Sequence, residues 1–243
     1  MNTKIYLLNI KSILNDPVTK YLDKFTPERR EKILRYKLNP DRNRTVHAEL
    51  LAKNVIAKIA NTDPDSIQIS RDINGKPYCN IPGIFLSLSH SGEWVACSVG
   101  DSPNGIDVEK SSNKIGIKIA KRFFLPNEYA QILKLYEANN QDWTRKFLEY
   151  WTLKESCLKC ENLRDWSNVD CEKLLHDPNL EIAGRNFHLQ NNYVLGICTH
   201  RNVLPDGFVY AFFHVSLKNT FSGSERNFAN SESRPDCMIF SSS

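Results

Sequence analysis

Several short segments of the chain alternate apolar and polar residues, a period of two that predicts β-strands. These segments are residues 4–10, 66–72, 84–100, 181–200 and 207–217. The segment at 84–100 contains Ser91 and Gly92, where we expect the turn of a hairpin. Strands are therefore expected near the start, in the middle and near the end of the chain.

Other segments repeat apolar residues every three or four positions, which predicts helices. Thr26 is an expected N-cap, and Pro27 then occupies the first helical position of the segment TPERREKILRY. A second helix is expected from about Asp41 to residue 60. Further helices are expected over residues 126–138 and 141–160.

This mixture of strands and helices, without a regular alternation of the two, predicts an α+β fold. The order strand, helices, strands occurs in residues 1–103 and again in residues 104–217, so we expect two similar halves. Residues 218–243 are rich in Ser, Asn, Arg and Glu without any periodicity. We expect them to form a disordered tail.

Composition adds only broad limits. The 243 residues include 41% hydrophobic and 25% charged residues, as in ordinary globular proteins, and the net charge of +4 does not indicate a broad nucleic-acid-binding face. Seven scattered cysteines predict reduced thiols rather than a disulfide framework. The N-terminal apolar run is too short for a signal segment or a membrane span, and we expect a cytoplasmic protein.

The segment GIDVEK, residues 105–110, raises an electrostatic question. Residues two apart on a strand share a face, so Asp107 and Glu109 point the same way while Ile106 and Val108 face the core. Two like charges a few ångströms apart repel by about 1–4 kcal/mol. A hard divalent cation such as Mg²⁺ would cancel this repulsion. Taken alone, the segment fits two solvated acids at a strand end better.

The helix expected at 141–160 combines an aromatic face with charged residues. Its apolar stripe consists of Trp143, Phe147, Trp151 and Leu158. Lys154 lies near the middle of this face, where an ammonium group needs a nearby anion or a path to water. Glu155 and Lys159 lie together at one edge, either as an ordinary surface pair or at the rim of a cleft.

GIDVEK followed by WTLKESCLK at 151–159 resembles the signature pair of the Sfp-type 4'-phosphopantetheinyl transferases. PERREK at 27–32, NGKPY at 74–78, SLSHSGEW at 87–94 and KRFF at 121–124 resemble further pieces of that family, in its order. The resemblance extends over about residues 1–215. Two departures are Ser87, where the family often has Asn, and Cys160-Glu161-Asn162, where it often has a glycine-containing turn.

The resemblance implies two similar α+β halves related by a pseudo-twofold axis, with the active site in the cleft between them. It implies transfer of the phosphopantetheine arm of coenzyme A to a carrier-protein serine, releasing adenosine 3',5'-bisphosphate. Asp107, Glu109 and Glu155 resemble the family's Mg²⁺ ligands. Glu155 is also the candidate base, and Lys159 resembles the lysine that stabilises the departing phosphate.

The remaining coenzyme A contacts are also inferred from the family resemblance. Lys32 and Arg29, with Arg44 nearby, resemble contacts to the 3'-phosphate, whereas Lys76 and Arg71 are expected to face the nucleotide. Ser89 and His90 resemble a phosphate-binding pair at a strand end. Gly75 would let the backbone approach a ligand closely.

The protein partner is expected to be an acyl or peptidyl carrier protein. Such carriers are usually acidic around the modified serine, and a basic segment follows the GIDVEK strand. It contains Lys114, Lys118, Lys121 and Arg122. This segment is either the carrier dock or a routine amphipathic stretch. The chain length resembles the pseudo-dimeric branch of the family, so we expect a monomer that acts in peptide, polyketide or fatty-acid synthesis.

Three alternatives remain at this point. Cys157 and Cys160 form a C-x-x-C, but no second pair at zinc-site spacing follows it. A non-catalytic module that binds coenzyme A or a nucleotide would share the phosphate contacts without needing all of the acidic residues and Lys159. A nucleic-acid binder would use the basic helices, although the sequence has no recognised motif for that role.

Overall fold

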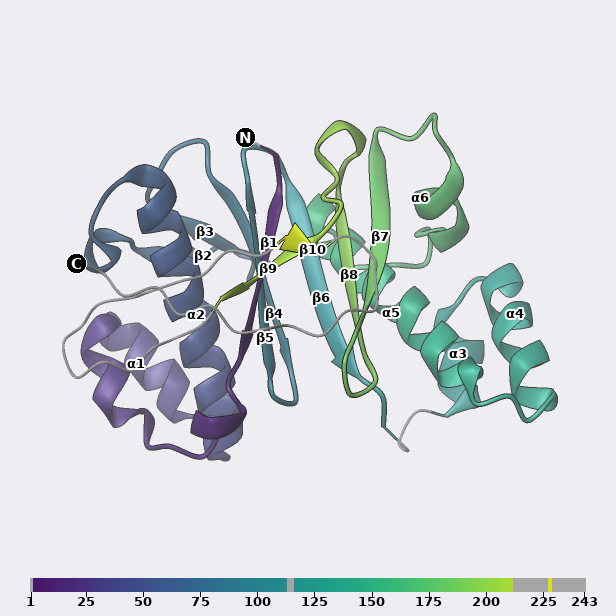
Figure 1. Cartoon of the computed structure of the whole chain (residues 1–243), viewed down its shortest axis with the longest axis horizontal. Coiled ribbons are helices and arrows are strands. Elements are labelled where there is room, and N and C mark those ends of the chain that lie inside the picture. Colours follow the sequence, from purple (N-terminus) through teal and green to yellow (C-terminus); the bar gives the residue numbers. More distant parts are fainter. Residues whose placement is uncertain (1, 113–115, 212–226, 229–243) are drawn as a thin grey trace.

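The computed structural model describes residues 2–112, 116–211 and 227–228 (Figure 1). The strands are β1 Lys4–Asn9, β2 Ile69–Arg71, β3 Pro77–Cys79, β4 Phe85–Ser91, β5 Trp94–Gly100, β6 Asn104–Lys110, β7 Ile182–Leu189, β8 Tyr193–His200, β9 Phe208–Ala211 and β10 Asn227–Phe228. The α-helices are α1 Pro27–Leu34, α2 Asn39–Ala60, α3 Ile117–Phe123, α4 Pro126–Glu137, α5 Asp142–Glu161 and α6 Cys171–His176. Short 3₁₀ helices cover Lys11–Ile13, Val18–Lys24, Pro64–Ser66 and Arg201–Val203.

The strands form two main sheets and one small ribbon. The larger sheet has the order β10-β9-β1-β5-β4, the second has the order β6-β8-β7, and β2 pairs with β3. Among the described strands, β9 pairs with β1 in parallel and the other pairings are antiparallel. The α+β class expected from the sequence is confirmed.

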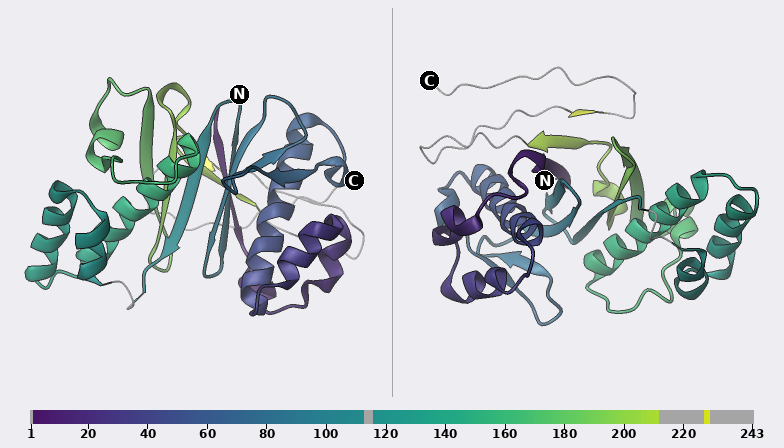
Figure 2. Two further views of the ribbon diagram at one scale, coloured as in Figure 1. Left: turned by 180° about the vertical axis from the view of Figure 1, so that it is seen from behind. Right: turned by 90° about the horizontal axis from the view of Figure 1, so that it is seen from below.

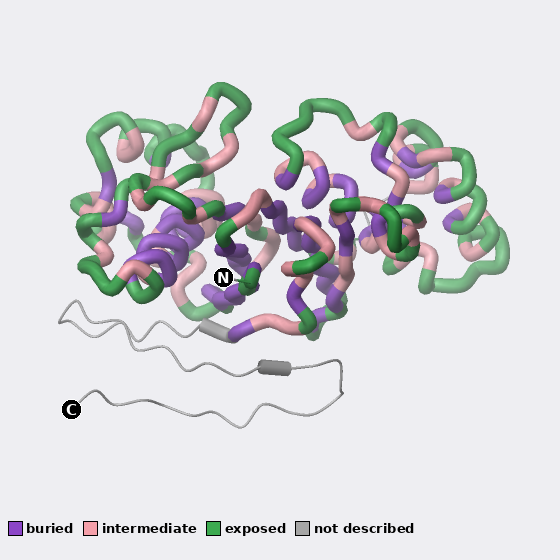
Figure 3. Tube along the Cα trace, turned by 90° about the horizontal axis from the view of Figure 1, so that it is seen from above, coloured by how far each residue is buried: buried purple, intermediate pink, exposed green. Residues whose placement is uncertain are grey.

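The two main sheets pack against each other, and each carries a long helix on its other side (Figures 1 and 2). Alternation along β1 explains this arrangement, because Tyr6 and Leu8 pack towards α2 whereas Ile5 and Leu7 pack towards the second sheet. The expected core positions of β6, Ile106 and Val108, are fully buried in the same interface. Buried residues accordingly concentrate along the central strands and α2 (Figure 3).

Helix α5 packs closely on β6 and β8, and glycine makes this possible. A Cβ atom at Gly105 would lie 1.9 Å from the Ser156 carbonyl oxygen. A Cβ atom at Gly196 of β8 would lie 2.6 Å from the Thr152 backbone. The first residue of GIDVEK therefore lets the helix that carries Glu155 and Lys159 lie directly against the strand that carries Asp107 and Glu109.

Strands β4 and β6 are edge strands of separate sheets, yet serine side chains of β4 join them. The hydroxyl oxygens accept backbone N–H bonds in three parallel contacts: Ser87 from Ile106 at 3.1 Å, Ser89 from Val108 at 3.2 Å, and Ser91 from Lys110 at 3.1 Å. The alternating serines satisfy donors that would otherwise be unpaired at the edge of β6. Ser87, a departure from the family pattern, takes part in this ladder.

Several expected elements are confirmed with small shifts. Thr26 caps α1 by accepting a hydrogen bond from Arg29 N at 3.4 Å, α2 begins at Asn39 rather than near Asp41, and the hairpin turn lies between β4 and β5. After α5, Asn162 adopts φ +55° and ends the helix in the left-handed conformation that glycine often provides.

The C-terminal strands differ from the sequence expectation. β9, expected within residues 104–217 as part of the second half, pairs with β1 of the first half. Of the expected disordered tail at 218–243, the structure describes only residues 227–228, and these form β10 beside β9. Within the described residues, no helix is long and apolar enough to cross a membrane.

Candidate active site

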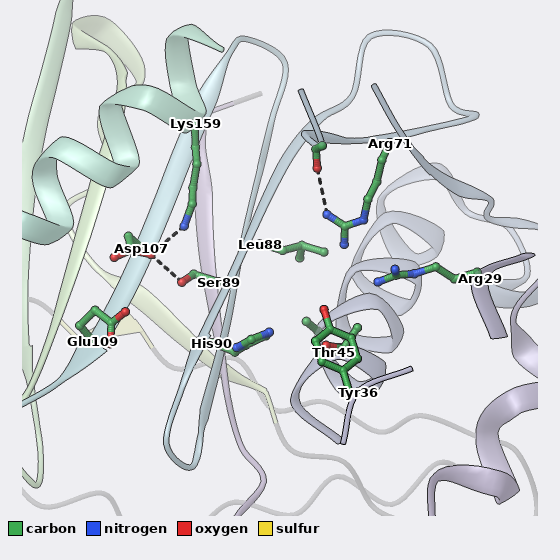
Figure 4. Close-up of a pocket in the computed structure, with 12 residues that line it drawn as sticks. Arg29, Tyr36, Thr45, Arg71, Leu88, Ser89, His90, Asp107, Glu109 and Lys159 are labelled. Atoms are coloured by element: carbon green, nitrogen blue, oxygen red, sulfur yellow. Dashed lines mark hydrogen bonds and ion pairs between the residues drawn. The ribbon is translucent and has the colours of Figure 1, made fainter. Parts of the chain in front are cut away.

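A cavity of about 490 Å³ opens where β4 and β6 meet, and residues from both sheets line it (Figure 4). Seven of the functional side chains expected from the sequence line this cavity: Arg29, Arg71, Ser89, His90, Asp107, Glu109 and Lys159. They come from α1, β2, β4, β6 and α5, which are widely separated in the chain. Figure 4 shows the acidic residues and Lys159 on one side of the cavity and the two arginines on the other.

Asp107 is the most buried acid of the acidic side, with 4% of its surface exposed. Its Oδ1 atom accepts hydrogen bonds from Ser89 Oγ at 2.8 Å and Lys159 Nζ at 2.7 Å. Its Oδ2 atom is buried without a hydrogen-bond partner among the described residues. A buried carboxylate oxygen left in this state is costly, and a bound cation would satisfy it.

Burial and the charge of Asp107 both raise the pKa values of the neighbouring carboxylates, Glu109 and Glu155. Burial, with a further contribution from Asp107, raises the pKa of Glu109 to about 7, although Ser91 Oγ donates a hydrogen bond to Glu109 at 2.8 Å. Burial and then Asp107 also raise the pKa of Glu155. The charge of Asp107 therefore disfavours the ionised forms of Glu109 and Glu155, and a bound divalent cation would relieve this repulsion.

Asp107, Glu109 and Glu155 do not form a complete metal-binding site by themselves. In the part of the chain that is described, no group of three or more His, Cys, Asp or Glu side chains is close enough to hold a metal ion. Glu155 lines an adjoining cavity of about 260 Å³, and Lys159 lines both cavities. Mg²⁺ commonly binds one or two carboxylates and completes its shell with water and phosphate oxygens. Asp107, whose Oδ2 atom has no partner in the described part of the chain, and Glu109 fit that role.

Lys159 does not form the surface pair that its spacing from Glu155 allowed. Its ammonium group reaches across to β6, where it donates to Asp107 Oδ1 and to the Ile106 carbonyl at 3.1 Å. Lys159 is therefore positioned inside the cavity wall, between the carboxylates and the adjoining cavity.

The opposite side of the cavity is basic. Arg29 and Arg71 both bind the carboxylate of Glu49, which is buried in α2. His90 lies between the two sides in Figure 4. Its residue is exposed at the cavity, and partial desolvation there, with the nearby charges of Arg44 and Lys159, lowers the pKa of its imidazole. In its neutral form an imidazole offers a ligand one donor nitrogen and one acceptor nitrogen.

Three residues expected to contact coenzyme A do not line the main cavity. Lys32 is exposed on α1. Arg44 donates to Asp41 at 2.5 Å and to the Gly92 carbonyl at 3.0 Å. Lys76 lines the adjoining cavity, and its ammonium group donates to the Cys160 carbonyl at the end of α5 at 2.9 Å. Gly75, beside it, has φ +86° and lines both cavities, in a conformation that glycine adopts without strain.

Sequence reasoning missed Tyr36, Thr45 and Glu49. Tyr36 and Thr45 line the cavity, and the Thr45 hydroxyl is buried without a hydrogen-bond partner among the described residues. Thr45 and Glu49 are four residues apart on α2 and therefore share a face. A sequence signal was available for Glu49, which is the one acid in the mostly apolar stretch from Val46 to Ile56.

Two other sequence questions are answered outside the cavity. The ammonium group of Lys154 has the anion that its apolar surroundings required: Glu128, at 2.9 Å, with both side chains fully buried. Cys157 and Cys160 are buried free thiols. Within the described residues they belong to no group of three or more potential metal-binding side chains.

Comparison with known proteins places these features in a family. A family model described as the 4'-phosphopantetheinyl transferase superfamily matches residues 103–211, and one described as 4'-phosphopantetheinyl transferase, N-terminal, matches residues 16–100. The chain is 33% identical to the 4'-phosphopantetheinyl transferase ffp of Bacillus subtilis, over 88% of this chain and 100% of the relative. It is 31% identical to another Bacillus subtilis 4'-phosphopantetheinyl transferase, over 74% of this chain and 84% of the relative. The 35% identity to the transferase Sfp of Bacillus subtilis extends over 58% of this chain and 62% of that relative.

Proposed function

Because the chain belongs to the family of Sfp-type 4'-phosphopantetheinyl transferases, we propose that it transfers the phosphopantetheine arm of coenzyme A to a serine of an apo carrier protein. Adenosine 3',5'-bisphosphate is the second product, and Mg²⁺ is required. The observation that carries this proposal is the shared cavity. On one side a carboxylate oxygen of Asp107, unpaired among the described residues, lies beside Lys159, and on the other side are two arginines.

The chemistry is a displacement at phosphorus. The serine oxygen attacks the phosphorus that carries the pantetheine arm, and the bond from that phosphorus to the bridging oxygen of the pyrophosphate breaks. The serine proton passes to a base, for which the family resemblance makes Glu155 the candidate. Lys159 Nζ balances negative charge on the departing phosphate.

Asp107, Glu109 and Glu155 are the residues that would hold Mg²⁺, which when bound supplies charge neutralisation at the pyrophosphate. The adenosine bisphosphate part of coenzyme A is proposed to extend from there to the basic side of the cavity. The contacts proposed from the family pattern remain Arg29, Lys32, Arg44, Arg71, Lys76, Ser89 and His90.

The carrier is proposed to dock on α3. Lys118, Lys121 and Arg122 are exposed there, whereas Lys114 lies outside the described residues. Basic side chains suit an acidic carrier, and complementary charge chiefly accelerates encounter. Carriers of peptide, polyketide and fatty-acid synthesis are the candidate partners of a monomeric, cytoplasmic enzyme.

A pseudo-twofold relation of the two halves remains part of the proposal. It is supported by a repeated unit: antiparallel strands β1, β5 and β4 with helix α2 of 22 residues, and antiparallel strands β6, β8 and β7 with helix α5 of 20 residues. The test is a superposition of residues 1–103 on residues 104–217.

The decisive experiment is incubation with coenzyme A, Mg²⁺ and a panel of apo carrier proteins, followed by intact mass measurement of each carrier. A phosphopantetheine-sized gain on one carrier, lost in Glu155→Gln, would support the reaction and the role of Glu155. A non-catalytic coenzyme A-binding module would bind coenzyme A and modify no carrier.

A further inference from the structure

Glu49 is a buried carboxylate that joins two arginines from different parts of the chain. It lies on α2 with 2% of its surface exposed. Its Oε2 atom accepts from Arg29 Nε at 3.1 Å, and its Oε1 atom accepts both from Arg29 Nη2 at 2.5 Å and from Arg71 Nη2 at 2.9 Å. Arg29 comes from α1 and Arg71 from β2, so Glu49 is the common partner of both guanidinium groups.

The charge of this trio favours an anion. Two guanidinium groups and one carboxylate carry a net charge of +1, and the carboxylate lies on the buried side while the arginines line the cavity. Contacts among the described residues use two N–H groups of Arg29, and two of Arg71 because its Nη1 also donates to the Gly75 carbonyl at 3.0 Å. Each guanidinium has five N–H donors, so three remain on each for a ligand.

Without Glu49, Arg29 would lose its described side-chain contacts, and Arg71 would keep its bond to the Gly75 carbonyl. Two guanidinium groups repel each other, and a long arginine side chain that loses its partner regains rotamer freedom. The shared oxygen of Glu49 sets the separation of the two groups, and the bidentate contact with Arg29 also fixes the plane of that guanidinium. The Glu49 carboxylate therefore holds the two guanidinium groups in a fixed relative position before any ligand binds.

We propose that Glu49 is a positioning residue that orients Arg29 and Arg71 as a paired fork for the terminal phosphomonoester of the substrate, and that selection of coenzyme A over its 3'-dephospho form depends on it. This inference rests on the proposed function. A phosphomonoester has three acceptor oxygens and a charge close to −2, which suits two guanidinium forks, and the Thr45 hydroxyl is an additional buried group at this cavity.

The first test is a comparison of Glu49→Gln with the wild type, using coenzyme A and 3'-dephospho-coenzyme A in carrier modification. We expect the KM for coenzyme A to rise by about tenfold or more, the loss of roughly one charge-assisted hydrogen bond, with kcat little changed. The KM for the dephospho form should change little, so the preference for coenzyme A collapses. Glu31→Gln is the matched control, because Glu31 pairs with Arg35 on the exposed side of α1.

A mutant cycle separates positioning from general structural damage. Arg29→Gln and Arg71→Gln should each weaken the preference for the 3'-phosphate, and adding Glu49→Gln to the double arginine variant should have no further effect. The inference would be overturned by any of three results. These are an equal loss of kcat with both substrates, an unchanged preference for coenzyme A over its dephospho form in Glu49→Gln, or additive effects of the substitutions in the cycle. Arg71, 36% exposed at its side chain, provides a variant that does not depend on tolerance at a buried position.

Binding measurements keep this inference separate from the proposed function. Calorimetric titration of the wild type and Glu49→Gln with coenzyme A and with 3'-dephospho-coenzyme A measures the binding preference for the 3'-phosphate without any carrier. If no carrier is modified but the preference still depends on Glu49, the transfer reaction is wrong and the positioning role stands. If carriers are modified and binding shows no such dependence, the positioning role is wrong.

Discussion

Ser89 and Asp107 are joined by a hydrogen bond across the junction of the two main sheets. Ser89 Oγ donates to Asp107 Oδ1 at 2.8 Å and at the same time accepts from the backbone N–H of Val108 at 3.2 Å. One hydroxyl thereby pairs an edge donor of β6 and orients a carboxylate of the candidate active site. The Ser89 hydroxyl therefore contributes both to the packing of the two sheets and to the candidate active site.

Ser89→Ala should therefore affect both stability and activity. The substitution leaves the Val108 N–H without its partner and removes a donor from Asp107, so we expect a loss of about 1–3 kcal/mol in the free energy of unfolding. Urea denaturation measures this loss, and Ser70→Ala, at an exposed position of β2, is the control. A variant as stable as the wild type would contradict the role of the serine ladder.

Glu128 is expected to be essential for stability rather than for catalysis. Besides its ion pair with Lys154, it accepts backbone N–H bonds from Leu125 and from Cys171, each at 2.9 Å. Glu128→Gln leaves a buried ammonium without a counter-charge and should cost about 3–5 kcal/mol. Thermal and urea unfolding measure the effect, with exposed Glu137→Gln on the same helix as control. A cost below about 1 kcal/mol would be inconsistent with an unrelieved buried charge.

His47 should make the protein less stable in mild acid. Burial lowers the pKa of its imidazole to about 4, although its Nδ1 lies 2.8 Å from the Asn43 carbonyl. The imidazole takes up a proton near pH 6.5 in the unfolded chain but only near pH 4 in the folded chain. The free energy of unfolding is therefore unaffected by His47 above pH 6.5 and decreases as the pH falls from 6.5 to 4. The total loss is about 3 kcal/mol.

Urea unfolding from pH 7 to pH 4.5 tests this linkage. His47→Gln should show a flatter dependence on pH than the wild type. His176→Gln, at a side chain that is 72% exposed, should keep the wild-type slope. Equal slopes for the wild type and His47→Gln would assign the acid sensitivity to other groups.

Removing the charge of Asp107 should lower the pKa of Glu109 in the metal-free protein. Asp107 disfavours the ionised form of Glu109, so Asp107→Asn should bring its pKa down from about 7 towards the usual value of 4.5. Because burial is the larger cause, the pKa should remain above 4.5. Carbon-13 NMR of labelled glutamate measures the titration, and an unchanged pKa would show that the two carboxylates are not coupled.

Charge reversal on α3 tests the proposed carrier dock. Lys118→Glu with Lys121→Glu should raise the KM for an acidic carrier by about tenfold and leave the affinity for coenzyme A unchanged. Lys134→Glu, at an exposed site on α4, is the control for each single reversal, because it changes the charge by the same amount as Lys118→Glu or Lys121→Glu but away from α3. An unchanged carrier KM in the α3 variant would remove the dock from this helix.

Local periodicity was sufficient for much of the fold. The two-residue period of β6 correctly assigned Ile106 and Val108 to the core and the carboxylates to the other face, because strand geometry alone decides this. The position of Lys154 on the apolar face of its helix correctly required an anion. The sequence could not identify that anion as Glu128, which is 26 positions earlier and reaches Lys154 only after α4 packs on α5.

What the sequence determined by itself was therefore the type of each element, the face on which a residue lies, and the family to which its spaced motifs belong. The tertiary structure decided which distant groups share an atom: Lys159 with Asp107, the β4 serines with β6, and Arg29 and Arg71 with Glu49. The physical reason is that backbone geometry repeats over a few residues and can be read locally. A contact between side chains that are remote in sequence depends on the path of the whole chain and on the packing of the buried core that keeps them together.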